Sequence, residues 1–256
     1  MLKIMISGIT GRMGKLIAYA INSIQDVTLV GGTSLRSAPG QIDFNGVSVQ
    51  IGNAPDQIVP KTDVIIDFSE ISATEKLLDC AVKYGKALVI GTTGAFNFEK
   101  LRQASEAVPV FYSANFSLGI YLINKLIPVI LKTLPVEEYD IEILETHHRW
   151  KKDLPSGTAL TIGQVVASCL GKRLKDIMRK DQSPRNCGEL GISSIRGGSA
   201  FGEHEIMFLG REETVKIKHA VLNRTVFART AVKAAKWVTG KPPGLYGMDD
   251  MLSSLI

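Results

Sequence analysis

The stretch that decides the fold is Leu2–Gly14, with the sequence LKIMISGITGRMG. It begins with a short apolar run typical of a buried strand, and Gly8, Gly11 and Gly14 follow at once. Met13–Ser23 then has the spacing of an amphipathic helix. A strand, a glycine-rich turn and a helix in this order let backbone amides receive a pyrophosphate at the helix start. Because the spacing is GxxGxxG instead of GxGxxG, a turn in a flavodoxin-like sheet that binds nothing is the alternative.

Short apolar runs alternate with helical stretches along residues 1–117. The runs expected to be strands are Val27–Gly31, Val64–Phe68, Ala87–Ile90 and Val108–Tyr112, and Ala73–Tyr84 has helical spacing. This alternation predicts a parallel sheet covered on both faces. We therefore expect an α/β protein whose residues 1–117 form a Rossmann-like dinucleotide-binding domain.

Residues 118–225 have a different pattern, which is typical of a second, α+β domain with an antiparallel or mixed sheet. Two helices are expected at Leu118–Leu134 and Ser156–Leu170, the second of which Gly171 would end. The expected strands are Tyr139–Thr146, Ile192–Arg196, Glu205–Leu209 and Thr214–Ala220. Helical spacing returns at Val226–Thr239, and we expect a C-terminal helix, 226–256, to complete the first domain.

The composition narrows the class of protein. The 256 residues carry a net charge of +5, from 30 basic and 25 acidic side chains. So mild an excess indicates a local pocket for an anionic ligand and not a nucleic-acid surface. The three cysteines form no CxxC pair, no signal-peptide pattern follows Met1, and lysines interrupt the apolar stretch 118–136. We expect a cytoplasmic protein with no nucleic-acid or membrane partner.

The end of the second strand bears on the choice of cofactor. An acidic residue there would bind the ribose 2′-hydroxyl of NAD, but the sequence reads Thr33–Ser37, TSLRS. The hydroxyl of Ser34 and the guanidinium of Arg36 suit a 2′-phosphate. We expect NADPH to be preferred, with NADH possible; the alternative is that Arg36 is a solvated loop cation.

Two further loops follow strands at the same edge of the expected sheet. Asp67-Phe68-Ser69 ends one strand, and Gly91-Thr92-Thr93-Gly94 follows the next. Ligands of open α/β sheets bind at this edge. Either loop alone is compatible with an ordinary turn, but with the glycine turn they outline one crevice.

The most informative segment for chemistry is Glu145–Ala159, ETHHRWKKDLPSGTA. Ser156 is an expected helix N-cap, so the amides of Gly157 and Thr158 would point toward a carboxylate. His148 and Lys151 would add charge and donors beside them. The segment therefore favours a small dicarboxylate ligand, although a structural histidine pair and solvated lysines are the alternative.

Two other chemistries fit this segment poorly. Adjacent histidines point apart, and no cysteine or carboxylate triad completes a metal site, so we expect none. Ser156 lies between Pro155 and Gly157 without the GxSxG elbow of a serine nucleophile.

Six motifs follow one another along the chain: Gly11–Gly14, Gly91–Gly94, Ser113–Gly119, His147–Ala159, Gly202–His204 and Lys241–Leu252. In this order they are similar to those of the 4-hydroxy-tetrahydrodipicolinate reductase (dihydrodipicolinate reductase) family. The resemblance spans nearly the whole chain, and the pattern HHxxKxDxPSGTA is highly specific. It implies reduction of 4-hydroxy-tetrahydrodipicolinate to tetrahydrodipicolinate by hydride transfer from NAD(P)H, in diaminopimelate and lysine biosynthesis.

The resemblance also implies roles for individual residues. His147 resembles the general acid and Lys151 its partner; His148, Gly157 and Thr158 resemble the binders of substrate carboxylates, beside Ser156. Together with the loops above, the expected cofactor site consists of Gly8, Thr10, Gly11, Arg12, Met13, Gly14, Ser34, Arg36, Phe68, Gly91, Thr92, Thr93, Ser113, Asn115 and Phe116.

The family further implies a substrate and tetramerisation domain, hence a homotetramer. The departure from its pattern is Leu35, where many members carry an acid; this agrees with the charge argument for Arg36.

Neighbouring cations should disfavour protonated His147 in the empty site, and a bound dianion should reverse this, so either His147 or Lys151 is a candidate proton donor. Two rivals stay open at this point. One is another two-domain nicotinamide dehydrogenase, acting on aspartate semialdehyde or an amino acid. The other is a non-catalytic NADPH-binding sensor.

Overall fold

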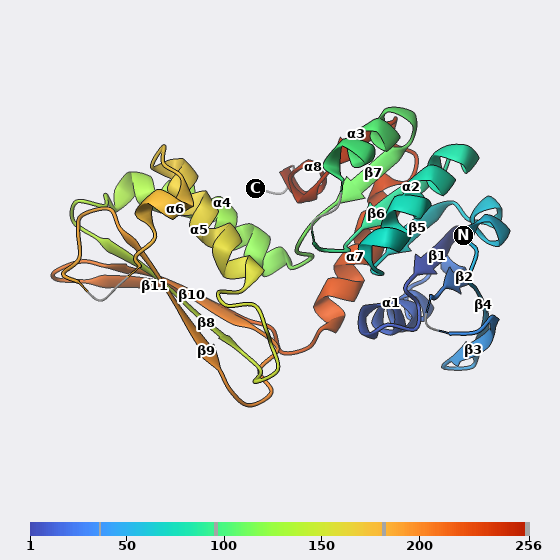
Figure 1. Ribbon diagram of the computed structural model, residues 1–256, viewed down its shortest axis with the longest axis horizontal. Helices are drawn as coiled ribbons and strands as arrows, with labels where there is room; N and C mark the ends of the chain where they lie inside the picture. The colour runs from blue at the N-terminus through green and yellow to red at the C-terminus, as the bar shows by residue number, and fades with distance from the viewer. Residues whose placement is uncertain (36, 95–96, 181–182, 254–256) are drawn as a thin grey trace. The chain divides into compact units, whose positions relative to one another are not determined.

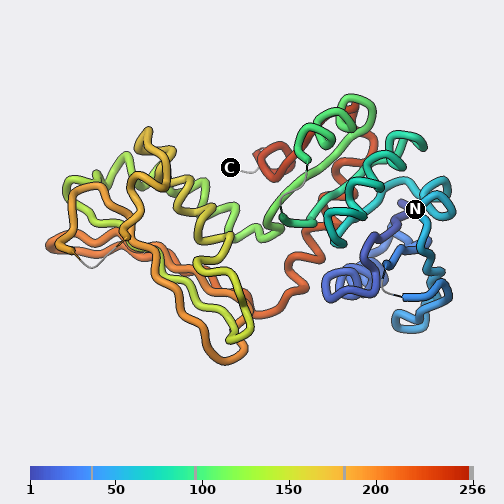
Figure 2. Tube along the Cα trace, viewed as in Figure 1, coloured from blue at the N-terminus to red at the C-terminus, as the bar shows by residue number. Residues whose placement is uncertain are grey.

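The computed structural model describes residues 1–35, 37–94, 97–180 and 183–253 (Figure 1). The chain divides into two compact units. Unit 1 comprises Met1–Phe116 and Arg224–Ile256, and unit 2 comprises Ser117–Asn223. Figure 2 shows that the first, blue part of the trace and its last, red part both belong to unit 1.

An eight-stranded sheet lies at the centre of unit 1, in the order β12-β7-β6-β5-β1-β2-β4-β3. Neighbouring strands are parallel except for the antiparallel hairpin of β3 and β4. All residues of β5 and β6 are buried, as expected for parallel strands covered on both faces. The strands are β1 (Leu2–Ser7), β2 (Val27–Thr33), β3 (Gly40–Phe44), β4 (Val47–Gly52), β5 (Val64–Asp67), β6 (Ala87–Ile90), β7 (Pro109–Tyr112) and β12 (Gly244–Tyr246).

Helices cover this sheet in two pairs. Helix α1 (Arg12–Asn22) packs against α7 (Thr225–Val238), and α2 (Ile71–Tyr84) packs against α3 (Phe98–Ala107) (Figure 1). Short elements complete the unit: η1 (Pro55–Gln57), η2 (Val59–Lys61) and α8 (Met248–Leu252). Because α7 also contacts β5, β6 and β7, residues near the C-terminus are part of the core of unit 1.

Unit 2 has a four-stranded mixed sheet in the order β11-β10-β8-β9. Its strands are β8 (Asp140–His147), β9 (Leu190–Arg196), β10 (Glu203–Leu209) and β11 (Thr214–Ala220); β8 and β9 are parallel and the other pairs antiparallel. Unit 2 also contains three helices, α4 (Leu118–Thr133), α5 (Gly157–Cys169) and α6 (Leu174–Ile177). One hydrophobic cluster joins α4, α5 and the sheet.

The predicted fold class is confirmed, and apart from the expected C-terminal helix 226–256 each predicted strand and helix has a counterpart whose ends agree within two residues. The hairpin of β3 and β4 and helix α3 were not predicted. The expected C-terminal helix 226–256 is wrong as a single element, because α7 ends at Val238 and β12 and α8 follow. Gly240, with φ +83, and the Pro242-Pro243 pair break the helical path.

Candidate functional site

The turn between β1 and α1 depends on glycine at two positions. A Cβ at Gly8 would lie 2.6 Å from the carbonyl oxygen of Phe68, and Gly8 has φ +78. A Cβ at Gly14 would lie 2.1 Å from the carbonyl oxygen of Gly8. Gly11 is the N-cap of α1, where no side chain caps the helix and no acidic residue occupies the first turn. The positive end of α1 is therefore not neutralised by its own side chains.

Asp67, at the end of β5, joins the neighbouring loops through hydroxyl groups. Its carboxylate is fully buried and accepts hydrogen bonds from Ser69 Oγ, Thr74 Oγ1 (2.6 Å) and Thr92 Oγ1 (2.9 Å). Burial raises the pKa of Asp67 although these hydrogen bonds act to lower it. One side chain thus ties together the end of β5, the start of α2 and the loop after β6.

The ring of Phe68 packs directly against the backbone of Gly91. A Cβ at Gly91 would come within 2.2 Å of its Cζ atom, so this contact requires glycine. On another side, the Phe68 ring meets that of Phe116, with centroids 5.3 Å apart. Phe68 therefore packs together the ends of β5, β6 and the segment after β7.

A hydroxyl pair connects the glycine turn with the end of β2. Thr10 Oγ1 and Ser34 Oγ are 2.6 Å apart, and Ser34 is buried. In the segment after β7, Ser113 Oγ donates to the carbonyl oxygen of Asn115 at 2.7 Å. Arg36, on which the cofactor argument partly depends, lies outside the described residues.

The other predicted cofactor residues all lie in unit 1, in loops that follow parallel strands or in the helix turn directly after such a loop. The loops after β1, β2, β5, β6 and β7 contain Gly8, Thr10, Gly11, Ser34, Phe68, Gly91, Thr92, Thr93, Ser113, Asn115 and Phe116, and the first turn of α1 contains Arg12, Met13 and Gly14. Ligands of such sheets bind at this edge.

The second group of predicted residues lies in unit 2, on one face of its sheet. On this face, one row of aligned residues is apolar and the next row is polar. Along the buried side of β8, Ile141 and Ile143 are followed by Glu145 and His147. Across the sheet, Ile143 aligns with Ile192, Ile206 and, through β10, Ile217. The next row consists of Ser194, Glu145, His204 and His219. A hydrophobic core and a polar network thus share one face of the sheet.

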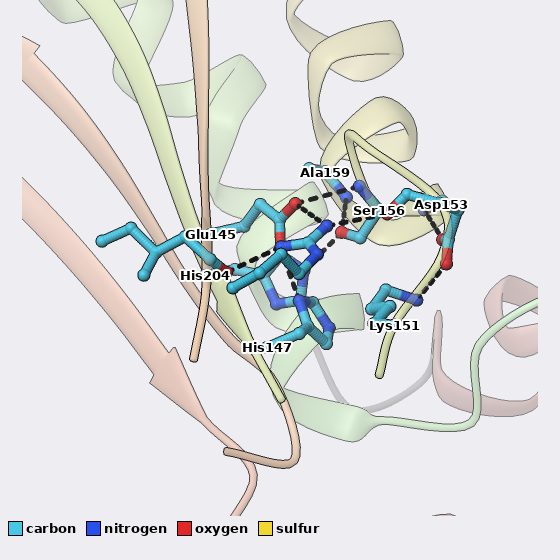
Figure 3. A network of polar contacts seen from close by, with 10 residues as sticks. Glu145, His147, Lys151, Asp153, Ser156, Ala159 and His204 are labelled. Atoms are coloured by element: carbon cyan, nitrogen blue, oxygen red, sulfur yellow. Dashed lines mark hydrogen bonds and ion pairs between the residues drawn. The ribbon is translucent and has the colours of Figure 1, made fainter. Parts of the chain in front are cut away.

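Glu145 is the centre of this network, with no exposed surface (Figure 3). Arg196 donates to both carboxylate oxygens, at 2.8 and 2.6 Å, and the amide of Ser156 donates to Oε1 at 3.1 Å. Burial acts to raise the pKa of Glu145, but these bonds and one from His147 outweigh it and lower the pKa to about 2. The group is therefore ionised at neutral pH.

His147 takes its orientation from Glu145 (Figure 3). Because an ionised carboxylate can only accept, Nδ1 of His147 must donate to Glu145 Oε2. Nε2 is then the atom available to a ligand, and a Cβ at Gly202 would lie only 2.9 Å from it. Burial lowers the pKa of His147, Glu145 acts in the opposite direction, and Lys151 and Arg196 lower it further.

The start of α5 lies beside these groups (Figure 3). Ser156 is the N-cap, and its Oγ accepts from the amide of Ala159 at 3.2 Å. Asp153 reaches two groups of the predicted carboxylate site: Lys151 Nζ at 2.8 Å and the amide of Gly157 at 3.4 Å. The first turn contains no acidic residue. Asp153 is therefore the acidic side chain that these contacts place at the positive end of α5, and the helix itself adds none in its first turn.

The structure brings His147, Lys151, Ser156 and Gly157 into this one region, with Thr158 in the same turn of α5. His148 follows β8, and its ring packs against Trp150 with centroids 5.8 Å apart. Sequence reasoning missed Glu145, Arg196 and His204 as members of the site. The alternation along β8 could have found Glu145, since it shares a face with His147.

Glu145, His147 and His204 also present ligand atoms within 4.8 Å of one another, which is a spacing compatible with a metal. Both oxygens of Glu145 already accept from the Arg196 guanidinium. A cation bound there would face a fixed positive charge, so we assign no metal to these residues.

Known proteins resemble this chain along its whole length. The 4-hydroxy-tetrahydrodipicolinate reductase of Rickettsia bellii is 40% identical over 253 residues, which cover 98% of this chain and 94% of the relative. That of Aquifex aeolicus is 36% identical over 260 residues, 98% of each. In fold, a dipicolinate-bound dihydrodipicolinate reductase from Paenisporosarcina sp. TG-14 matches with a TM-score of 0.79 and 20% identity over 100% of both chains.

Fold, site and relatives together define a two-domain oxidoreductase that depends on a pyridine nucleotide. The family model described as "Dihydrodipicolinate reductase, N-terminus" matches residues 2–116, and "Dihydrodipicolinate reductase, C-terminus" matches residues 119–252. The chain belongs to the dihydrodipicolinate reductase family. Among the described helices, none has the length and apolarity needed to cross a bilayer.

Proposed function

We propose that this chain reduces 4-hydroxy-tetrahydrodipicolinate to tetrahydrodipicolinate in diaminopimelate and lysine biosynthesis. The reaction consumes a hydride from the nicotinamide and a proton, and it releases the 4-hydroxyl group as water. The observation that carries the proposal is the contact of His147 with Glu145 beside the start of α5. It combines an oriented imidazole with a helix end suited to a carboxylate.

The substrate is a dianion, and the residues at the start of α5 suit its carboxylates. The amides of Gly157 and Thr158 lie in the first turn, next to the N-cap Ser156. Lys151 and His148 supply charge and a further donor. The helix dipole and the first-turn amides favour negative charge at this place.

We assign the role of general acid to His147 and that of its partner to Lys151. In the empty site the pKa of His147 is low, chiefly because the ring is buried. A substrate dianion would raise this pKa, because a nearby negative charge favours the protonated ring. Binding of substrate would thus prepare the proton that the reaction consumes.

The cofactor residues proposed for unit 1 are those of the glycine turn and the loops around Phe68, Gly91 and Asn115. When bound there, the nicotinamide supplies the hydride. We propose a preference for NADPH over NADH, because Ser34 and Arg36 follow β2 where NAD-specific proteins carry an acid. Arg36→Ala should then weaken NADPH far more than NADH in kcat/KM.

We also propose that the protein is cytoplasmic, and that it acts as a homotetramer, the latter on its family resemblance alone. Light scattering of the purified protein measures the assembly directly, and a monomeric mass would contradict it.

The direct test is oxidation of NADPH and NADH followed at 340 nm, with substrate generated in situ by the preceding synthase. Synthase-dependent turnover is the expected result. His147→Gln should lower kcat by about 100-fold or more, as loss of a general acid does. Nucleotide binding without turnover would contradict the proposed reaction and favour a sensor.

A further inference from the structure

We propose that His204 is a positioning residue for the carboxylate-binding start of α5. The inference rests on the proposed function, since it concerns the same substrate site. His204 lies on β10, directly opposite Glu145 on β8, and only 5% of its surface is exposed. None of the chemical roles above requires it, although it lies inside the network.

The contact that matters is between His204 Nε2 and Ser156 Oγ, which are 3.1 Å apart (Figure 3). The same Oγ accepts from the amide of Ala159, and the amide of Ser156 donates to Glu145. Ser156 is thus held at its amide by one strand and at its hydroxyl by the next. In either tautomer of His204, the bond fixes the rotamer in which Ser156 caps α5, and hence the direction of the first-turn amides.

His204 also contacts the proposed acid. Its ring lies edge-on to that of His147, with centroids 5.2 Å apart. Burial lowers the pKa of His204 to about 4, and the charge of His147 lowers it as well. The ring is therefore neutral at pH 7, and it can hold Ser156 without repelling a proton on His147.

The sheet contains a second contact of the same kind, which serves as a control. His219 aligns with His204 on the neighbouring strand, and its Nε2 lies 3.0 Å from Ser117 Oγ. Ser117 is the N-cap of α4, just as Ser156 is that of α5. Both pairs tie a helix start to the sheet, but only the pair of His204 ends at the proposed substrate site.

The test is calorimetric titration of dipicolinate, a planar dicarboxylate, into the NADPH-saturated protein. His204→Phe keeps a ring of similar size and removes the bond to Ser156, whereas His204→Gln keeps an acceptor at the reach of Nε2. We expect His204→Phe to weaken dipicolinate about tenfold, the upper end for one hydrogen bond, and His204→Gln to restore affinity to within about threefold. The Kd of NADPH should not change, and His219→Phe should leave the Kd of dipicolinate as in the wild type.

A double-mutant cycle shows whether His204 acts through Ser156. In a Ser156→Ala background, His204→Phe should cause no further loss of dipicolinate affinity. Equal losses from His204→Phe and His219→Phe, additive losses in the cycle, or failure of His204→Gln to rescue would each overturn the proposal. If His204→Phe does not fold, His204→Asn replaces it throughout, because its shorter side chain cannot reach Ser156. A wild-type protein that does not bind dipicolinate would instead count against the proposed substrate site.

Discussion

His147 donates from Nδ1 to a carboxylate on its own strand, that of Glu145, two residues earlier on the same face of β8. This arrangement decides the tautomer of the imidazole and leaves Nε2 for the proposed transfer of a proton to the substrate. Arg196, on the adjacent strand, keeps the carboxylate ionised. Glu145 thus orients the proposed acid, and Arg196 keeps Glu145 negatively charged. Neither of these two side chains needs to touch the substrate.

Glu145→Gln should move the pH profile of kcat. Glu145 raises the pKa of His147, so its removal lowers that pKa further. A general acid acts when protonated, and the rate falls as pH rises through its pKa, so this fall should begin at a lower pH in the variant. Stopped-flow turnover across pH 5–9 measures it. In the His147→Gln background, adding Glu145→Gln should leave the profile unchanged; a shift there would assign the profile to another group.

Gly202→Ala should reduce kcat by about 100-fold, an effect comparable with loss of the acid. Its new Cβ would lie 2.9 Å from His147 Nε2, and the φ of +153 disfavours any side chain. Gly197→Ala is the matched control, because a Cβ there meets no atom within 4 Å among the described residues. Equal kcat values for the two variants would show that Nε2 is not the working atom.

Asp153→Asn should tighten dipicolinate binding about two- to fivefold. In the empty site the Asp153 carboxylate reaches Lys151 and the amide of Gly157, the groups proposed to receive the ligand. The expected gain is small because the pair is partly exposed and such pairs contribute at most about 1 kcal/mol. Asp176→Asn, which breaks an exposed pair with Arg173, should leave the affinity unchanged. Weaker binding by Asp153→Asn would mean that Asp153 orients Lys151 instead of competing for it.

The free energy of unfolding of the wild type, relative to that of Asp67→Asn, should increase as pH falls through the raised pKa of Asp67. Burial raises this pKa above its ordinary value of 3.8, so between 3.8 and the raised pKa the folded state binds more protons than the unfolded state. Stability contributed by such a group increases as pH falls through the raised pKa. Urea unfolding of both proteins at stepped pH measures the two free energies of unfolding. A wild type that loses stability relative to Asp67→Asn as pH falls toward 4 would contradict the assignment.

Much of the fold could be predicted because apolar runs of the parallel sheet are continuous and separated by turn residues. The hairpin of β3 and β4 was missed because neither strand is a continuous apolar run: β3 is mostly exposed, and in β4 buried and exposed residues are interspersed. A local signal was present: Asn45-Gly46, with φ values of 55 and 82, is typical of a tight hairpin turn. Helix α3 was missed for a similar reason, since few of its residues are buried.

The candidate site could be predicted only where its residues are close in sequence. His147, Lys151 and Ser156 lie within one short segment and share a capped helix start. Arg196 and His204 lie about 50 residues later and reach the site through strand register. Neither hydrophobic pattern nor motif spacing specifies which residues of β9 and β10 align with Glu145.

The return of the chain to unit 1 at Arg224 has a consequence for synthesis on the ribosome. Residues 117–223 form a continuous unit with its own hydrophobic cluster, so they can fold as soon as they have emerged. The sheet of unit 1 cannot be completed before this, because α7 and β12 are synthesised after unit 2. Nascent chains arrested before residue 224 should therefore expose the apolar face that α7 later covers, and this is the stage at which chaperone binding is expected.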